Sequence, residues 1–208
     1  MYIGIFLMKK IVIAVKGIWI FVWANIFALF AYEKKYINGI YFSGKYHGIL
    51  APGWKWIISD CMARFLLGIN RGVPFPVSPR INITGYKNII FHNDDLNNFQ
   101  GIGNYYQAIG NGKIIIGKGS WIAQNVGLIT TNHDINDPEF HVESKDIVIG
   151  EKCWIGMNSV ILPGVTLGPH TTVGAGSIVT KSFSEGYCVI AGNPARIIKK
   201  LSVTIGTS

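Results

Sequence analysis

The chain has 208 residues, of which 49% are hydrophobic and only 14% are charged, and its formal net charge is +8. This composition excludes a disordered chain, which needs low hydrophobicity with high net charge, and a coiled coil, which needs charged residues beside its apolar seam. The cysteines Cys61, Cys153 and Cys188 are odd in number and far apart. Neither a disulfide framework nor a zinc knuckle is therefore expected.

The N-terminal residues contain a long apolar segment. Residues 11–32 are interrupted only by Lys16, Gly17 and Asn25, and a helix of that length would extend about 33 Å, enough for a hydrocarbon core of about 30 Å. Lysines flank both ends of this segment, so they indicate no orientation. We expect a membrane-associated helix over residues 1–32, either spanning the bilayer or lying in its interface. A buried core helix is the alternative.

Residues 33–80 are predicted to form an amphipathic helix and a proline-rich linker. Apolar residues recur at helical spacing within residues 56–68, and Asp60 and Arg64 pair at i, i+4 on another face. The apolar positions are Ile57, Ile58, Cys61, Met62, Phe65 and Leu66. This helix either caps the core that follows or touches a membrane. Three prolines in residues 72–80 indicate a boundary before residue 81.

The positive charge is concentrated near the N-terminus. Residues 1–56 hold seven lysines and one acidic residue, Glu33. A basic segment beside an apolar one indicates an anionic membrane surface as a partner rather than a nucleic acid.

A repeat of six residues runs through the C-terminal half. Its first positions are large and aliphatic, and its fifth positions are mostly small. The first positions are Ile149, Ile155, Ile161, Leu167, Val173 and Val179, with the same phase at Ile116, Ile122 and Leu128; the fifth are Cys153, Ser159, Val165, Thr171, Ser177 and Phe183. One inward aliphatic and one small corner residue per six predict a triangular parallel β-helix over residues 81–200, with 18 residues per coil.

The repeat is interrupted once and degenerates at both ends. Its phase is lost between residues 134 and 149, which predicts an inserted loop of 15 residues, and long loops on a rigid scaffold are usually functional. Before residue 116 we expect two irregular coils. Residues 185–200 are expected to form a last half-coil and a short helix, and residues 201–208 a tail.

Several stretches resemble the hexapeptide-repeat acyltransferases, and most of all those that O-acetylate sugars and surface polysaccharides. The resemblance is carried by ITTNHD (129–134), CWIGMNSVILPGVTLG (153–168), VGAGSIVTKSF (173–183) and AGNPARIIKK (191–200). It implies a mainly β fold, a left-handed parallel β-helix with an extended loop. It also implies a homotrimer that binds acetyl-coenzyme A, without a metal, in the cleft between neighbouring subunits.

The resemblance implies a catalytic histidine. In such enzymes the histidine just before the insertion is the general base, here His133, which takes a proton from a sugar hydroxyl during direct transfer. Asn132, Asp134 and Asp137 are candidates for orienting His133. We assign Asn132, Asp134 and His141, together with Trp121, to the acceptor side of the site.

The donor side is implied in the same way. Trp154 matches the tryptophan that packs along the pantetheine arm, and Trp121 holds the same place one coil earlier; simple corner packing is the alternative for both. Ala175, Thr180 and Lys181 resemble positions at the pantetheine amides, the adenosine and the phosphates. Arg196 is expected to add to the phosphate region, and a solvated basic helix end is the alternative for it. Met157 departs from the pattern, because many relatives have a small residue there, often serine. No hydroxyl can stabilise the oxyanion at this position, so a backbone N–H is the alternative.

The sequence therefore predicts an acetyl-coenzyme-A-dependent O-acetyltransferase for a bacterial surface polysaccharide or its lipid-linked precursor. Because the donor is cytosolic, we expect it at the cytoplasmic face of the inner membrane. An N-acyltransferase acting on an amino sugar or a small amine is the alternative. A γ-type carbonic anhydrase would need three zinc-binding histidines, and a third partner for His133 and His141 is not evident. A non-catalytic scaffold would not need the histidine and donor motifs together.

Overall fold

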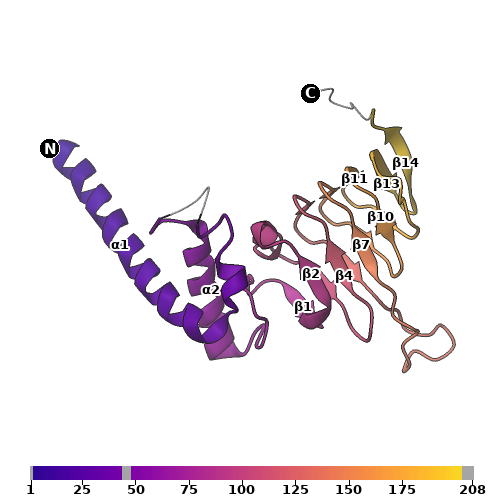
Figure 1. The fold of residues 1–208 in the computed structure, drawn as a ribbon, viewed down its shortest axis with the longest axis horizontal. Helices are drawn as coiled ribbons and strands as arrows, with labels where there is room; N and C mark the ends of the chain where they lie inside the picture. The colour runs from indigo at the N-terminus through magenta and orange to yellow at the C-terminus, as the bar shows by residue number, and fades with distance from the viewer. Residues whose placement is uncertain (1, 44–47, 203–208) are drawn as a thin grey trace. The chain divides into compact units, whose positions relative to one another are not determined.

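A computed structural model describes residues 2–43 and 48–202 (Figure 1). The chain divides into two compact units, with the division between Pro79 and Arg80. The sequence predicts a boundary at residue 33, after the N-terminal helix. Residues on both sides of that boundary belong to the first unit. From residue 203 on, the predicted tail lies outside the described residues.

The first unit contains helix α1 (Tyr2–Ala31), a short 3-10 helix η1 (Lys34–Ile37) and helix α2 (Pro52–Leu67). Residues Met8–Ala31 of α1 are long and apolar enough to cross a membrane, by length and composition. Among the side chains of α1 that the structure describes, the buried ones form one stripe of small residues, Gly17, Ala24 and Ala28. Most other side chains of α1 are exposed within this unit, which is not the pattern of a buried core helix.

Helix α2 differs from the prediction. Its start at Pro52 is earlier than expected, and proline suits the first turn because its missing N–H would be unbonded there. Ile57 and Cys61 are buried as predicted, but Asp60 and Arg64 are buried too, whereas Met62 and most of the last turn are exposed. The face that we expected to be polar and exposed therefore points inward. Burial of its two charges is possible because they pair with each other, with 2.7 Å between Arg64 Nη2 and Asp60 Oδ2.

Helices α1 and α2 run in the same direction. Phe21 contacts Trp54 with ring centroids 5.0 Å apart, and further along both helices Phe27 lies 6.1 Å from Phe65. The C-terminal ends of the two helices therefore lie at the same end of the unit.

The second unit is a triangular β-helix whose coils contribute in turn to three faces. All strand pairs are parallel except β13 with β14. The first face holds β1 (Asn82–Thr84), β3 (Tyr105–Gln107), β6 (Gly127–Ile129), β9 (Val160–Ile161) and β12 (Ile178–Val179). The second holds β2 (Ile89–Phe91), β4 (Ile114–Ile116), β7 (Ile147–Ile149) and β10 (Thr166–Leu167). The third holds β5 (Trp121–Ile122), β8 (Trp154–Ile155), β11 (Thr171–Val173), β13 (Cys188–Gly192) and β14 (Ala195–Lys200).

The register confirms the predicted repeat and the parallel β-helix. Val148 pairs with Thr166, 18 positions later, whereas Ile115 pairs with Val148, 33 positions later. The difference of 15 is the predicted insertion, which emerges between β6 and β7. All the predicted inward aliphatic positions are buried: Ile116, Ile122, Leu128, Ile149, Ile155, Ile161, Leu167, Val173 and Val179. The fifth positions are buried as well, except Phe183, which is partly exposed.

Glycines line the corner between the second and third faces. Gly117, Gly150 and Gly168 follow β4, β7 and β10, and a Cβ built on Gly150 would lie 2.7 Å from the carbonyl carbon of Gly168. The coils approach too closely there for any side chain, which explains the glycine at the second position of these sixes.

The first coil completes its third face with a 3-10 helix, η3 (Asn93–Phe99), which follows η2 (Tyr86–Asn88) and β2. The Asn98 side chain takes the place of a neighbouring strand. Its Oδ1 accepts a hydrogen bond from the Ile122 N–H at 2.9 Å, and its Nδ2 donates to the Ser120 carbonyl at 2.9 Å. The backbone of β5 is thereby satisfied at the edge of the face.

The predicted C-terminal helix is wrong. Residues 195–200 form β14, which pairs antiparallel with β13 after a turn that contains the cis peptide Asn193–Pro194. The β-branched pair Ile197 and Ile198 favours a strand over a helix, and β14 covers the edge that β13 would otherwise expose.

Candidate active site

The inserted loop is an ordered hairpin that projects from the β-helix between β6 and β7 (Figure 1). The Val142 N–H donates to the Asn132 carbonyl at 3.0 Å, and the Asp134 N–H donates to the Phe140 carbonyl at 2.9 Å. His133 and His141 face each other across this hairpin as an antiparallel bridge. The sequence predicted a loop here, and its backbone pairing fixes the position of His133.

The His133 ring is held by a backbone carbonyl. Its Nδ1 lies 2.6 Å from the Pro138 oxygen. A carbonyl oxygen can only accept, so Nδ1 carries the proton and Nε2 of the neutral ring keeps its lone pair. The His141 ring lies against the His133 ring, with centroids 4.2 Å apart. This arrangement presents a proton acceptor at an exposed position.

None of the three candidate orienting side chains makes this contact. Asp134 Oδ1 accepts from the Asn136 N–H at 2.7 Å, and Asp137 Oδ1 accepts from the Glu139 N–H at 3.1 Å. Asn132 contributes its backbone carbonyl to the hairpin. The partner of His133 is a backbone atom, which no pattern of side-chain types identifies.

A hollow of about 430 Å³ lies at the base of the loop. The polar residues that line it include Asn111, which precedes β4, and Thr131, His141, Glu143 and Ser144, which lie between β6 and β7. Of the residues assigned to the acceptor side, His141 lines this hollow. Its mixture of donors and acceptors suits a hydroxyl-rich ligand.

Trp121 and Trp154 lie side by side on the third face. They are register partners in β5 and β8, and their exposed fractions are 61% and 58%. Together with Gly119, Lys152 and Cys153 they line a groove of about 390 Å³. Both indole side chains are therefore accessible in a single copy of the chain, with Lys152 beside them. Burial raises the pKa of the Cys153 thiol, so Cys153 is a core residue and not a reactive one.

The other predicted donor residues are divided between two places. Ala175 is exposed at the corner that follows β11, and Arg196 is exposed in β14 on the third face. Thr180 and Lys181 follow β12 at the corner between the first and second faces, the same corner from which the His133 loop emerges. Met157 is exposed directly after Gly156.

This division has a consequence for the site. In a triangular coil, the corner between the first and second faces lies opposite the third face. One copy of the chain therefore presents His133 and the two tryptophans on opposite sides of its β-helix.

Within residues 2–43 and 48–202, no group of three or more His, Cys, Asp or Glu side chains is arranged to hold a metal ion.

Comparisons with known proteins agree with this architecture. Residues 146–181 match the family described as bacterial transferase hexapeptide (six repeats). The Escherichia coli protein WcaF, named as a colanic acid biosynthesis acetyltransferase, is 38% identical over 105 residues, which cover 50% of this chain and 57% of WcaF. The chain thus spans little more than half the length of that relative.

Two further matches are broader. The E. coli protein WbbJ, named as a lipopolysaccharide biosynthesis O-acetyl transferase, is 31% identical over 153 residues, covering 67% of this chain and 76% of WbbJ. A galactoside acetyltransferase solved in complex with coenzyme A superposes with a TM-score of 0.51 at 34% identity, covering 61% of each chain. With the repeat, the three-faced coil and the inserted loop in place, these matches show that the chain belongs to the hexapeptide-repeat acetyltransferase family.

Proposed function

We propose that the protein is an acetyl-coenzyme-A-dependent O-acetyltransferase whose acceptor is a sugar hydroxyl of a bacterial surface polysaccharide or of its lipid-linked precursor. The observation that carries this proposal is the His133 imidazole, held by Pro138 with its Nε2 available as a base. The names of WcaF and WbbJ, which refer to colanic acid and lipopolysaccharide biosynthesis, support the acceptor class.

In the proposed reaction, His133 Nε2 accepts the proton of the sugar hydroxyl as the hydroxyl oxygen attacks the thioester carbonyl carbon. The tetrahedral adduct collapses with cleavage of the carbon–sulfur bond. The proton on His133 then passes to the departing thiolate, which leaves as the free thiol of coenzyme A. The Nδ1–H bond to Pro138 stabilises the imidazolium formed in between and keeps the ring in one orientation.

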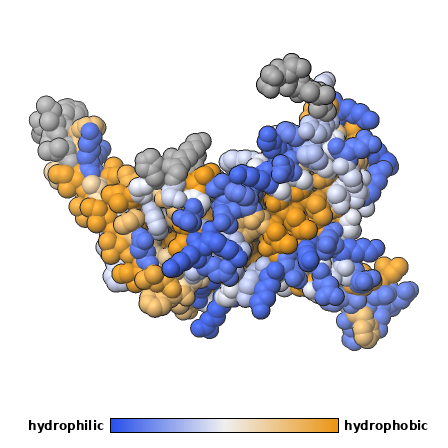
Figure 2. Space-filling model, viewed as in Figure 1, coloured by the Kyte–Doolittle hydropathy of each residue, from blue (hydrophilic) through white to orange (hydrophobic). Residues whose placement is uncertain are grey.

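We further propose that the site forms between two copies in a homotrimer. The loop of one copy supplies His133, and the third face of its neighbour supplies Trp121 and Trp154, because a single copy presents these groups on opposite sides. Outward side chains of the second face support association. Ile90, Ile115 and Val148 are register neighbours in β2, β4 and β7, and they are at least partly exposed. Figure 2 shows a hydrophobic patch over these strands.

The cytoplasmic face of the bacterial inner membrane is the proposed location. Most described side chains of α1 are apolar and exposed, and Figure 2 shows a largely hydrophobic surface along the helix on the side in view. Their burial in lipid would be favourable at about 25 cal/mol per Å². Lysines before and after the apolar run suit anionic headgroups, and a cytosolic donor requires the β-helix on the cytoplasmic side.

Replacement of His133 by alanine tests the reaction. We expect His133→Ala to lower kcat for acetyl transfer to a polysaccharide acceptor by about 10²–10⁴-fold, with little change in KM for acetyl-coenzyme A. His92→Asn, which removes an imidazole outside the site but keeps an acceptor for the Asp94 N–H, is the matched control. Retention of more than about a tenth of the wild-type turnover by a folded His133→Ala protein would refute the assignment.

A further inference from the structure

Helix α2 carries its exposed apolar residues at one end. The outward side chains of its first half include Lys55 and Ser59. Those of its second half are Met62, Phe65, Leu66 and Leu67, and Leu66 is 76% exposed. A helix that only covered a core would bury these four residues.

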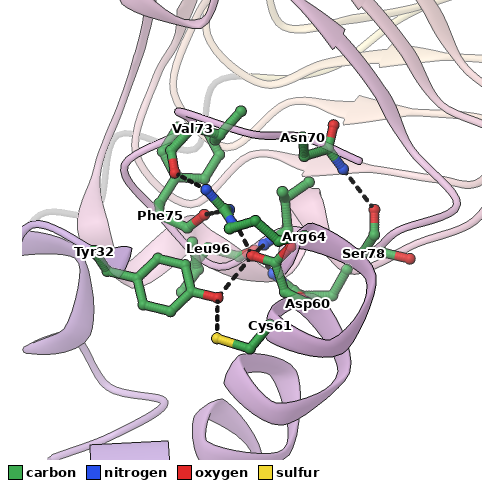
Figure 3. Close-up of polar contacts among 11 residues, drawn as sticks. Tyr32, Asp60, Cys61, Arg64, Asn70, Val73, Phe75, Ser78 and Leu96 are labelled. Carbon is green, nitrogen blue, oxygen red and sulfur yellow. Dashed lines mark hydrogen bonds and ion pairs between the residues drawn. The ribbon is translucent and has the colours of Figure 1, made fainter. Parts of the chain in front are cut away.

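The buried side of α2 holds a polar network that prevents such a rotation (Figure 3). Arg64 donates to Asp60 Oδ2 at 2.7 Å and to the Val73 carbonyl at 2.6 Å. The Tyr32 hydroxyl, just beyond α1, donates to the same Asp60 oxygen at 2.8 Å, and the Val77 N–H donates to it at 3.2 Å. Turning α2 over would carry Asp60 and Arg64 away together and leave the Tyr32 hydroxyl, the Val77 N–H and the Val73 carbonyl buried without these partners, which is unfavourable. The network therefore fixes the apolar residues on the outside.

The end of α1 extends this apolar area. Because α1 and α2 run parallel, the exposed Leu29 and Phe30 lie at the same end as the last turns of α2. We call the six residues Leu29, Phe30, Met62, Phe65, Leu66 and Leu67 the helix-end surface. Exposed basic residues follow each helix, Lys34 after α1 and Arg71 after α2, whereas Lys35 is paired with the exposed Glu33 at 2.7 Å. An apolar surface bordered by positive charge is complementary to an anionic lipid bilayer.

We propose that the helix-end surface inserts into an anionic phospholipid bilayer, so that α2 is a second membrane-inserting element beside α1. The proposal rests on the membrane association proposed above for α1. Small residues on the α1 stripe, Gly17, Ala24 and Ala28, suit close packing of the two helices in lipid. The Asp60–Arg64 pair stays between the helices and the segment that follows them, away from lipid.

Fluorescence of the full-length protein in phosphatidylglycerol–phosphatidylethanolamine vesicles tests the proposal. The native cysteines are buried, so an environment-sensitive dye can be attached at Leu66→Cys, at Lys55→Cys as the matched position on the polar half of α2, and at Val12→Cys on α1. We expect a blue shift and quenching by nitroxide-labelled lipids at positions 66 and 12. The dye at position 55 should remain accessible to a water-soluble quencher.

The outcomes separate the two membrane proposals. Quenching by lipid at position 12 but not at position 66 would overturn the proposal for α2 and leave that for α1 intact. Absence of lipid quenching at all three positions would overturn both. A dye at position 66 that is already shielded from the soluble quencher without vesicles would assign the helix-end surface to a second copy of the chain, which also overturns the proposal.

Discussion

Replacing Asn98 by leucine, which has nearly the same shape but no polar atoms, should destabilise the β-helix. The Asn98 side chain is buried and satisfies two backbone groups, the Ile122 N–H in β5 and the Ser120 carbonyl just before β5. Each would be left buried without a partner, at a cost of about 1–3 kcal/mol. The two losses together predict a decrease of about 2–6 kcal/mol in the free energy of unfolding.

Urea unfolding followed by far-ultraviolet circular dichroism measures this decrease. Asn97→Leu is the matched control, because Asn97 precedes Asn98 in η3 and is partly exposed; it should cost less than about 1 kcal/mol. Hydrogen exchange should also show faster exchange of the Ile122 amide in Asn98→Leu. Equal stability of the two variants would refute the view that Asn98 substitutes for a strand.

Three further outcomes follow from the second unit. Trp154→Ala should raise KM for acetyl-coenzyme A roughly tenfold or more with His133 intact, and an unchanged KM would remove Trp154 from the donor groove. Burial raises the pKa of Asp95. The contribution of this shift to the free energy of unfolding is therefore fully present below about pH 4 and is lost as the pH rises through the raised pKa. The stability of wild type relative to Asp95→Asn should fall between acid and neutral pH, and a pH-independent difference would contradict this. The buried thiols of Cys153 and Cys188 should react with iodoacetamide only on unfolding, as mass spectrometry of native and unfolded protein can show.

The repeat made the β-helix predictable, because a period of six with one aliphatic residue depends only on local spacing. The 15-residue insertion and the burial of residues such as Ile155 and Leu167 followed from the same phase. The orientation of α2 did not follow, since hydrophobic spacing assumes that the apolar side faces a core and that the charged side faces water. Asp60 and Arg64 reverse this assumption through a tertiary network with Tyr32 and the 73–77 segment.

Backbone atoms account for the other differences. His133 could be identified from its motif, but its Pro138 partner is a carbonyl, which every residue possesses. The strand β14 was mistaken for a helix because basic residues after a proline also suit a helix end. Its pairing depends on the free edge of β13, a tertiary feature. Trp121 and Trp154 were recognisable as equivalent positions, and their separation from His133 emerged only from the order of the faces.

The central claim is that one copy supplies the base and its neighbour the donor groove. Co-refolding His133→Ala with Trp154→Ala in equal amounts tests it directly, with transfer measured at subsaturating acetyl-coenzyme A. In a closed trimer, each site needs His133 from one copy and Trp154 from the next, so random mixing should restore about a quarter of wild-type activity. Activity no greater than the average of the two separate variants would contradict a site shared between copies.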